Sequence, residues 1–386
     1  MEIRTIVRKH SLLVSLFALF VFFALITEGR ILAPQNMSNL VLQNSYVLIM
    51  ACGMLLCILT GGNVDLSVGA VVCLIAATAA KLLESGMGSI PVILLCLLLS
   101  AIVGAWQGFW IGYMRIPSFI CTLAGMFMFR GFGREILDSQ TVIINDRAFF
   151  DIFTAYIAFP VIDSGDVKWS AMLVGCIISI LVAATVMSAR SRRIRKGYER
   201  PSLKNEIIKV IMIDALILAY TWKIAHFRGI SVMLIWVIAV VGFYQYLTTK
   251  SLTGRYLYAV GGNARTAELS GIDTAKIYFL AYTSMGLLAG LSALMVAARV
   301  GSVNGDIGNS FEMDAIGACF IGGASAAGGS GTVVGAVIGG LLLGVINQGM
   351  SIIGLGNNWQ YVVKGAILMF AVMFDIVSNR RLSKAS

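Results

Sequence analysis

The chain consists of long apolar runs separated by short polar segments. A membrane-spanning helix needs about 20 predominantly apolar residues, and most of these runs approach or exceed that length. The pattern predicts an all-α, polytopic membrane protein with about 10–12 transmembrane helices. The expected spans are residues 11–28, 40–60, 66–83, 89–113, 117–136, 169–189, 207–226, 229–249, 277–299, 313–329, 332–350 and 358–378.

Two pairs of these runs meet at segments rich in glycine and other small residues. The first junction reads "TGGNVDLS" at 60–67, and the second reads "GGASAAGGSGTVVGA" at 322–336. Interrupted helices leave backbone N–H and C=O groups free, which a membrane tolerates only inside protein or beside a water-filled cavity. We therefore expect broken or short helices near residues 61–67 and 313–331, beside a transport path.

Composition and charge agree with a membrane protein. Only 12% of the 386 residues are charged, whereas soluble domains carry about 25%. The net charge of +10 comes largely from basic segments at 4–9, 190–204, 250–276 and 380–384. Because these segments lie between apolar runs, they do not indicate nucleic-acid binding. The positive-inside rule places them and both termini in the cytoplasm, and it leaves 137–168 outside.

The sequence offers little chemistry for catalysis. The seven cysteines lie in apolar runs without a C-x-x-C pair, and there are only two histidines. We expect buried cysteines, no metal site and no disulfide framework. The phosphate-binding loop motif G-x-x-x-x-G-K-[ST] does not occur in the sequence. We therefore predict a protein that is not an enzyme, with no catalytic residue, no cofactor and no ATPase site of its own.

Asp65 is a carboxylate between long apolar runs. A charge in a membrane is costly, so it normally faces the protein interior or water. Because "LSVGAVV" follows it and starts a helix, Asp65 is either a helix N-cap or a direct contact for the transported solute or a coupling ion. The two interpretations overlap, and both stay open.

Other polar or aromatic residues in the spans are candidates for the same path, although buried amides commonly just bond neighbouring helices. The candidate path residues are Asn44, Asn63, Asp65, Ser67, Gln107, Phe119 and Asn347. Glu312 and Asp314 are expected at the outer mouth, where they either meet basic residues of a partner protein or cap the short helix.

A polar loop at 250–276 is predicted to hold a short helix. Asn263 is a plausible N-cap, residues 264–270 are good helix formers, and Gly271 fits the position after the helix end. A helix of two turns is unstable alone and needs a partner surface. The segment is either a solvated connector or a docking helix for a cytoplasmic protein.

Four motifs carry a family resemblance. They are "GGNVDLSVGA", "GRYLYAVGGNARTAELSGI", "FEMDAIGACFIGGASAAGGSGTVVGAVIGG" and "NNWQYVVKGAILMFAV". In this order they resemble the motifs of permease subunits of bacterial ATP-binding-cassette monosaccharide importers, the ribose, xylose and galactose group. By its length the chain is most similar to the xylose-type and multiple-sugar-type permeases.

The resemblance implies a homodimer in the bacterial cytoplasmic (inner) membrane, a separate cytoplasmic ATP-binding subunit and an extracytoplasmic sugar-binding protein. It also implies a single permease domain over 1–386, with an extra helical hairpin at 169–228 and a coupling loop at 250–276. The residues it assigns to ATPase coupling are Asn263, Ala267, Glu268, Leu269, Ser270, Gly271 and Ile272.

The leading functional hypothesis is therefore passage of a monosaccharide, driven by ATP hydrolysis on another subunit. The alternative is an ion-coupled secondary sugar transporter that uses Asp65 as its proton or sodium site. The first requires an ATPase partner for transport, whereas the second transports alone and stops when the ion gradient collapses.

Overall fold

The computed structural model describes residues 11–157, 159, 162–163, 165–195, 197 and 203–383. The basic segment expected in the cytoplasm at 4–9 lies outside the described residues. The helices are α2 (Ser11–Ile26), η1 (Arg30–Leu32), α3 (Pro34–Leu59), α4 (Val68–Glu84), α5 (Ser89–Gly112), α6 (Ser118–Ile136), α7 (Arg147–Thr154), α8 (Trp169–Arg195), α9 (Leu203–Ala225), α10 (Val232–Lys250), α11 (Leu252–Gly262), α12 (Ala264–Leu269), α13 (Thr274–Val300), α14 (Phe311–Ile321), α15 (Val333–Ile352) and α16 (Asn357–Ser383).

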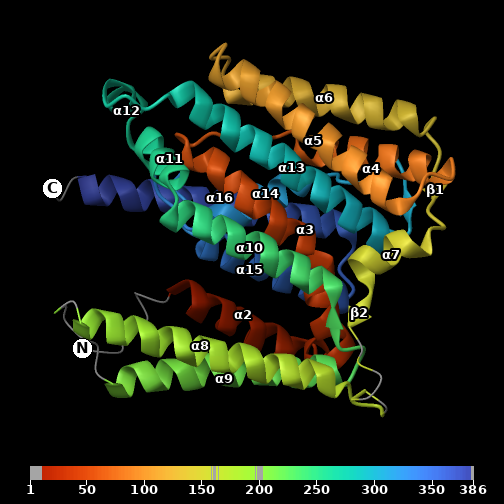
Figure 1. The fold of residues 1–386 in the computed structure, drawn as a ribbon, viewed down its shortest axis with the longest axis vertical. Coiled ribbons are helices and arrows are strands. Elements are labelled where there is room, and N and C mark those ends of the chain that lie inside the picture. The colour runs from red at the N-terminus through yellow and green to blue at the C-terminus, as the bar shows by residue number, and fades with distance from the viewer. Residues whose placement is uncertain are drawn as a thin grey trace.

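Figure 1 shows a helical bundle in which the long helices run side by side. The prediction of an all-α membrane protein is confirmed, and each of the expected apolar runs contains a helix. Among the described residues, 6 helices are long and apolar enough to cross a membrane by length and composition, namely α3, α5, α8, α10, α13 and α15. The α12 helix, the start of α9 and the end of α16 lie at one end of the bundle (Figure 1).

At the opposite end of the bundle, short antiparallel strand pairs connect the loops to one another. The β1 strand (Val142–Ile143) pairs with β4 (Ser302–Val303), and β2 (Tyr156–Ile157) pairs with β3 (Ile230–Ser231). These pairs tie the segment after α6 to the end of α13 and to the start of α10. They satisfy backbone groups of loops that would otherwise lack partners.

The core lies between α3, α4 and α13. Most of the apolar stretch of α3 and of α13 is buried inside the protein, whereas only 33%, 22% and 28% of the stretches of α5, α8 and α10 are buried. The exposed helices carry large apolar side chains outward, such as Leu94 on α5 and Ile180 on α8. In a membrane, these faces meet lipid or another apolar surface.

The contact between α5 and α13 depends on small residues. Gly104, Gly108 and Gly112 recur every four residues on one face of α5 and lie against the backbone of α13. A Cβ added to Gly104 would lie 2.6 Å from the carbonyl oxygen of Tyr282 and 2.9 Å from the Cα of Gly286. The two backbones can therefore approach closely only because these positions lack side chains.

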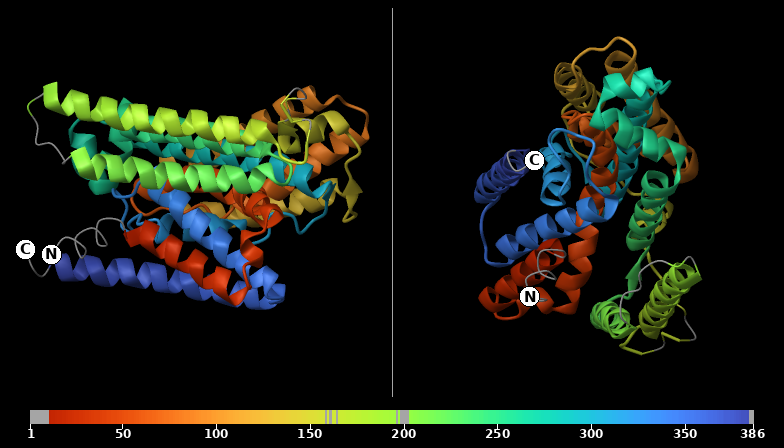
Figure 2. Two further views of the ribbon diagram at one scale, coloured as in Figure 1. Left: turned by 90° about the horizontal axis from the view of Figure 1, so that it is seen from below. Right: turned by 90° about the vertical axis from the view of Figure 1, so that its left-hand side faces the viewer.

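The α8 and α9 helices form a hairpin at the edge of the bundle (Figure 2). Gly175 of α8 lies against the side chain of Thr221 of α9, and a small separate core gathers around Ala171, Ile224 and Ala225. Cys176, which the sequence predicted to be buried, is instead exposed, because it lies on the outward face of α8. That the hairpin 169–228 is an addition to the family's common fold remains a prediction.

Candidate functional site

The two glycine-rich junctions, far apart in the sequence, meet in space. A Cβ on Gly62 would overlap with the carbonyl oxygen of Ala326, and a Cβ on Gly328 would overlap with the Cα of Gly61. The N–H of Gly329 donates to the carbonyl oxygen of Leu59, the last residue of α3, at 3.1 Å. A backbone group left free by one interrupted helix is thus satisfied by the other junction.

The helix after the first junction, α4, also meets the helix before the second junction, α14, at their first turns. A Cβ on Gly69 of α4 would overlap with the carbonyl oxygen of Gly308 and with Oε2 of Glu312 in α14. The ring of Phe311, the first residue of α14, stacks on Tyr46 near the middle of α3, with ring centroids 3.8 Å apart. The α14 helix has 11 residues, which is roughly 16 Å of length, about half of the membrane interior. The expected short helix is confirmed.

Asp65 lies in the first junction with 1% of its surface exposed. Its Oδ1 accepts hydrogen bonds from the backbone N–H of Ser67 at 2.8 Å and from the Ser67 hydroxyl at 2.7 Å. Gln107 of α5 donates from Nε2 to the Ser67 hydroxyl oxygen at 2.6 Å. The carboxylate is therefore held by a chain of polar groups that crosses from the junction to α5.

These bonds refine the N-cap interpretation of Asp65. The residue at the N-cap position of α4 is Ser67, and its side chain makes no capping bond to the helix. Asp65 satisfies the N–H of Ser67 itself, one step before the first turn of α4. It stabilises the turn that starts the helix.

Asn63 lies in the same junction. Its Nδ2 donates to the carbonyl oxygen of Thr60 at 3.0 Å, and its Oδ1 accepts from the hydroxyl of Ser118 at the start of α6 at 2.8 Å. The junction residues Asn63, Asp65 and Ser67, together with Gln107, which bonds to Ser67, are hereafter the junction cluster. Phe119 does not join them, because its side chain is 57% exposed on the outer face of α6.

The other two path candidates lie elsewhere. Asn44 of α3 donates from Nδ2 to the carbonyl oxygen of Leu40 at 2.6 Å, and its side chain lies against Gly344 of α15. Asn347 is one turn further along α15, and its buried Oδ1 has no hydrogen-bond partner. The structure therefore divides the candidates into the junction cluster and a second group between α3 and α15.

A buried ion pair at the start of α14 escaped the sequence analysis. Lys364 of α16 lies 2.9 Å from Oδ1 of Asp314, and the side chains are 16% and 2% exposed. Tyr46 donates its hydroxyl to Oδ2 of Asp314 at 2.8 Å. The expectation that Asp314 meets basic residues of a partner at an outer mouth is wrong, because α16 of the same chain supplies the basic residue. The signal was Lys364 itself, an isolated charge within the apolar run 358–378.

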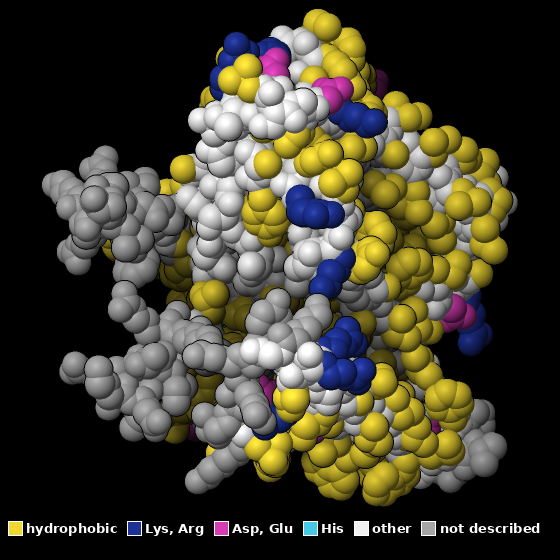
Figure 3. Space-filling model, turned by 60° about the vertical axis from the view of Figure 1, so that its left-hand side comes forward, with side chains coloured by type: hydrophobic (Ala, Val, Ile, Leu, Met, Phe, Trp, Pro, Cys, Tyr) yellow, Lys and Arg dark blue, Asp and Glu magenta, His cyan; other side chains and the backbone are white. Residues whose placement is uncertain are grey.

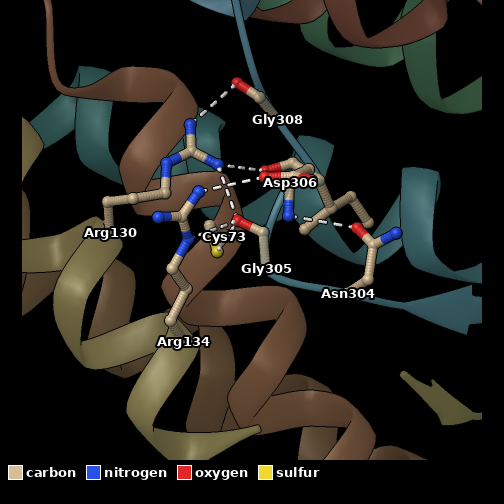
Figure 4. Close-up of polar contacts among 8 residues, drawn as sticks. Cys73, Arg130, Arg134, Asn304, Gly305, Asp306 and Gly308 are labelled. Atoms are coloured by element: carbon tan, nitrogen blue, oxygen red, sulfur yellow. Dashed lines mark hydrogen bonds and ion pairs between the residues drawn. The ribbon is translucent and has the colours of Figure 1, made fainter. Parts of the chain in front are cut away.

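Two arginines of α6 hold the loop that enters α14. Arg130 donates to the carbonyl oxygen of Ile307 at 2.7 Å, and Arg134 pairs with Asp306 at 3.0 Å. Both arginines also reach the carbonyl oxygen of Gly305, which the Cys73 thiol contacts at 3.6 Å (Figure 4). The carbonyl groups of this loop thus accept hydrogen bonds from the charged guanidinium groups of α6 rather than from backbone N–H groups of a helix or strand.

The loop at 250–276 forms two helices, α11 and α12. Oδ1 of Asn263 accepts from the N–H of Thr266 at 2.9 Å, so the predicted N-cap of α12 is confirmed. After α12, the backbone of Gly271 has φ of 83°, which favours glycine. The N–H groups of Gly271 and Ile272 donate to the carbonyl oxygens of Glu268 and Ala267, which is the pattern of a Schellman cap.

The coupling residues predicted for α12 lie on different sides of the helix. Ala267 is buried against the bundle, whereas Leu269 is 75% exposed. Glu268 pairs with Arg265 at 3.2 Å and with Arg115, in the loop between α5 and α6, at 3.5 Å. The α12 helix therefore packs against the bundle on one side and exposes Leu269 on the other.

Proteins of known description resemble the chain over nearly its whole length. The xylose transport system permease protein of Escherichia coli (strain K12) is 33% identical over 374 residues, which cover 96% of this chain and 92% of that protein. The ribose import permease protein of the same organism is 29% identical, covering 94% and 92%. Its galactose/methyl galactoside import permease protein is 28% identical, covering 96% and 94%.

No solved structure gives a significant match. Residues 36–372 match the family model described as "Branched-chain amino acid transport system / permease component". The matched range includes both junctions, the Asp314–Lys364 pair and the α11–α12 loop. The chain therefore belongs to the branched-chain amino acid transport system permease family.

Proposed function

We propose that this chain is the membrane-spanning permease subunit of an ATP-binding-cassette importer. It forms the translocation path for a monosaccharide of the xylose, ribose or galactose class. The observation that carries this proposal is the likeness of 96% of the chain to a xylose transport system permease protein, supported by the ribose and galactose permeases. Ion-coupled transport through Asp65, the alternative, finds no support in these relatives.

The junction cluster is proposed to line the sugar path. Asn63, Asp65, Ser67 and Gln107 supply hydroxyl, amide and carboxylate groups that can exchange hydrogen bonds with sugar hydroxyls. They lie where two interrupted helices meet, which is where transporters commonly bind their substrates. Asn44 and Asn347 remain candidates for a second contact along α3 and α15, whereas the exposed position of Phe119 speaks against a role for it.

ATP hydrolysis is assigned to a separate subunit that docks at α12. The exposed Leu269 is the apolar contact expected at such a surface, and Glu268, Ser270 and Gly271 flank it. Lys and Arg side chains line the end of the molecule that carries α12 (Figure 3), which supports a cytoplasmic position for this end and for both termini. A sugar-binding protein outside the membrane and a second copy of the permease complete the proposed assembly.

The test is reconstitution of the purified permease in liposomes, with and without the ATPase and binding protein that copurify with it. Labelled D-xylose, D-ribose and D-galactose are the probes, and labelled L-leucine is the control, because the family description names branched-chain amino acids. We expect uptake of at least one sugar that depends on ATP and on all components, and no uptake of leucine.

Two outcomes would contradict the proposal. Uptake of leucine in place of the sugars would move the substrate to another class. Sugar uptake by the permease alone, abolished by an ionophore and indifferent to ATP, would establish the ion-coupled alternative.

A further inference from the structure

The end of α11 lies directly against both junctions. A Cβ on Gly261 would overlap with the carbonyl oxygen of Leu59 at the end of α3, and it would lie 2.5 Å from the nitrogen of Gly329 in the second junction. These are the two groups that form the hydrogen bond between the junctions. The backbone of α11 therefore touches the hydrogen bond that links the two interrupted helices.

A side chain of α11 makes a second link to the same region. Tyr258, one turn before Gly262, donates its hydroxyl to the carbonyl oxygen of Gly331 at 2.8 Å. Gly331 directly precedes Thr332, the N-cap of α15. The hydrogen bond thus fixes the distance between α11 and the point where α15 begins.

The other end of this segment is α12. Asn263 alone separates α11 from α12, and it serves as C-cap of the first helix and N-cap of the second. With one residue between them, and with its caps satisfied, the α11–α12 unit has little freedom to bend. A displacement of α12 therefore displaces the end of α11.

We infer that the end of α11 transmits the movement of α12 to both interrupted helices at once, with Gly261 and Tyr258 as positioning residues. Gly261 allows the backbones to touch, and Tyr258 ties α11 to the start of α15. This inference rests on the proposed function, and it names the residues that connect ATPase docking to the junctions.

The chain offers matched control positions for both residues. Gly262 neighbours Gly261 in the same helix, but a Cβ there would have no neighbour within 4 Å. Tyr256 lies two residues from Tyr258 on α11. The variant pairs are Gly261→Ala with Gly262→Ala, and Tyr258→Phe with Tyr256→Phe.

Each variant is reconstituted as the full permease with its ATPase and binding protein. The quantities measured are ATPase bound per permease, ATP hydrolysed, and D-xylose, D-ribose or D-galactose taken up. We expect sugar uptake per ATP to fall about tenfold in Gly261→Ala, because the added Cβ would overlap with the backbones of Leu59 and Gly329 and force them apart. In Tyr258→Phe sugar uptake per ATP falls about fivefold, because the hydrogen bond to Gly331 is lost. In both variants the amount of ATPase bound per permease stays at the wild-type level. In both control variants sugar uptake per ATP stays within about twofold of the wild-type value.

The outcomes separate this inference from the function on which it rests. Equal uptake per ATP in Tyr258→Phe and Tyr256→Phe overturns it even if Gly261→Ala does not fold. A loss of ATPase binding that accounts for the loss of uptake also overturns it, because the residues then act on docking. If the wild-type complex takes up none of the sugars, the proposed function fails and this inference fails with it.

Discussion

The buried pair of Lys364 and Asp314 allows a quantitative test of how charge stabilises this fold. The perturbation is Lys364→Met, which shortens the unbranched side chain by one atom and removes its charge. It leaves the carboxylate of Asp314, 2% exposed, with the hydroxyl of Tyr46 as a hydrogen-bond donor. An unpaired charge in this buried position is unfavourable because no partner charge offsets its lost hydration.

The structure sets the magnitude of the effect. Two unit charges 2.9 Å apart attract by about 6 kcal/mol at an effective dielectric constant of about 20. The desolvation of both groups offsets part of this attraction, and removal of one partner of such a pair typically costs about 3–5 kcal/mol. We expect Lys364→Met to lower the free energy of unfolding by that amount.

A double-mutant cycle isolates the pair. Asp314→Asn alone leaves Lys364 buried and unpaired, so it is expected to cost a similar amount. The double variant Asp314→Asn/Lys364→Met removes both charges, and we expect it to lie within about 1 kcal/mol of the wild type. The two single effects are therefore strongly non-additive.

The assay is denaturant unfolding of the purified protein in mild detergent, and circular dichroism measures the fraction unfolded. The matched control is Lys81→Met, which breaks the exposed pair of Lys81 and Glu84 at 3.0 Å, with side chains 33% and 54% exposed. Such a pair contributes at most about 1 kcal/mol. The reasoning is refuted if Lys364→Met costs no more than Lys81→Met, or if the double variant costs the sum of the single ones.

Three further predictions concern other parts of the molecule. Gly104→Ala is expected to destabilise the protein by about 1–3 kcal/mol, because its Cβ meets the α13 backbone; Gly131→Ala, where a Cβ meets nothing within 4 Å, should not, and thermal unfolding compares them. Asp65→Asn should keep the fold because an amide oxygen accepts the same bonds, whereas Asp65→Leu should cost about 1–3 kcal/mol in the same measurement. Intact fold with lost sugar uptake in Asp65→Asn would exclude a purely structural role. The N–H of Ser170 lowers the pKa of Asp163, so this carboxylate stabilises the loop between α7 and α8 above its ordinary pKa of about 4 and ceases to do so as the pH falls below it. The hydrogen exchange rate of the loop, divided by the intrinsic rate at each pH, should therefore rise in acid, and less so in Asp163→Asn.

The positions of the helices were largely predictable because a membrane demands long apolar runs. The break after Leu59 and the shortness of α14 followed from glycine content, and the caps at Asn263 and Gly271 followed from local residue preferences. These features depend on neighbours in the sequence. The same logic placed Asn63, Asp65 and Ser67 close together, since they occupy one short junction.

Features that depend on distant contacts were not predictable from the pattern alone. Nothing near Leu59 indicates that its carbonyl oxygen accepts from Gly329, since the two residues lie on different junctions. The pairing of Asp314 with Lys364 requires knowing that α14 packs on α16. The recurrence of Gly104, Gly108 and Gly112 at four-residue spacing is the kind of signal that sequence analysis can use, because it marks a helix face for close packing.

The contacts between the junctions also constrain how the path can open. The bond from Gly329 to Leu59 replaces the partners that both groups would have in a continuous helix. If the junctions separate during transport, both groups lose this bond, and an unsatisfied backbone group in an apolar environment costs several kcal/mol. Separation is therefore favourable only when water or a sugar hydroxyl supplies the missing partners. On this argument, the proposed path opens at the junctions only when water or a sugar enters between them.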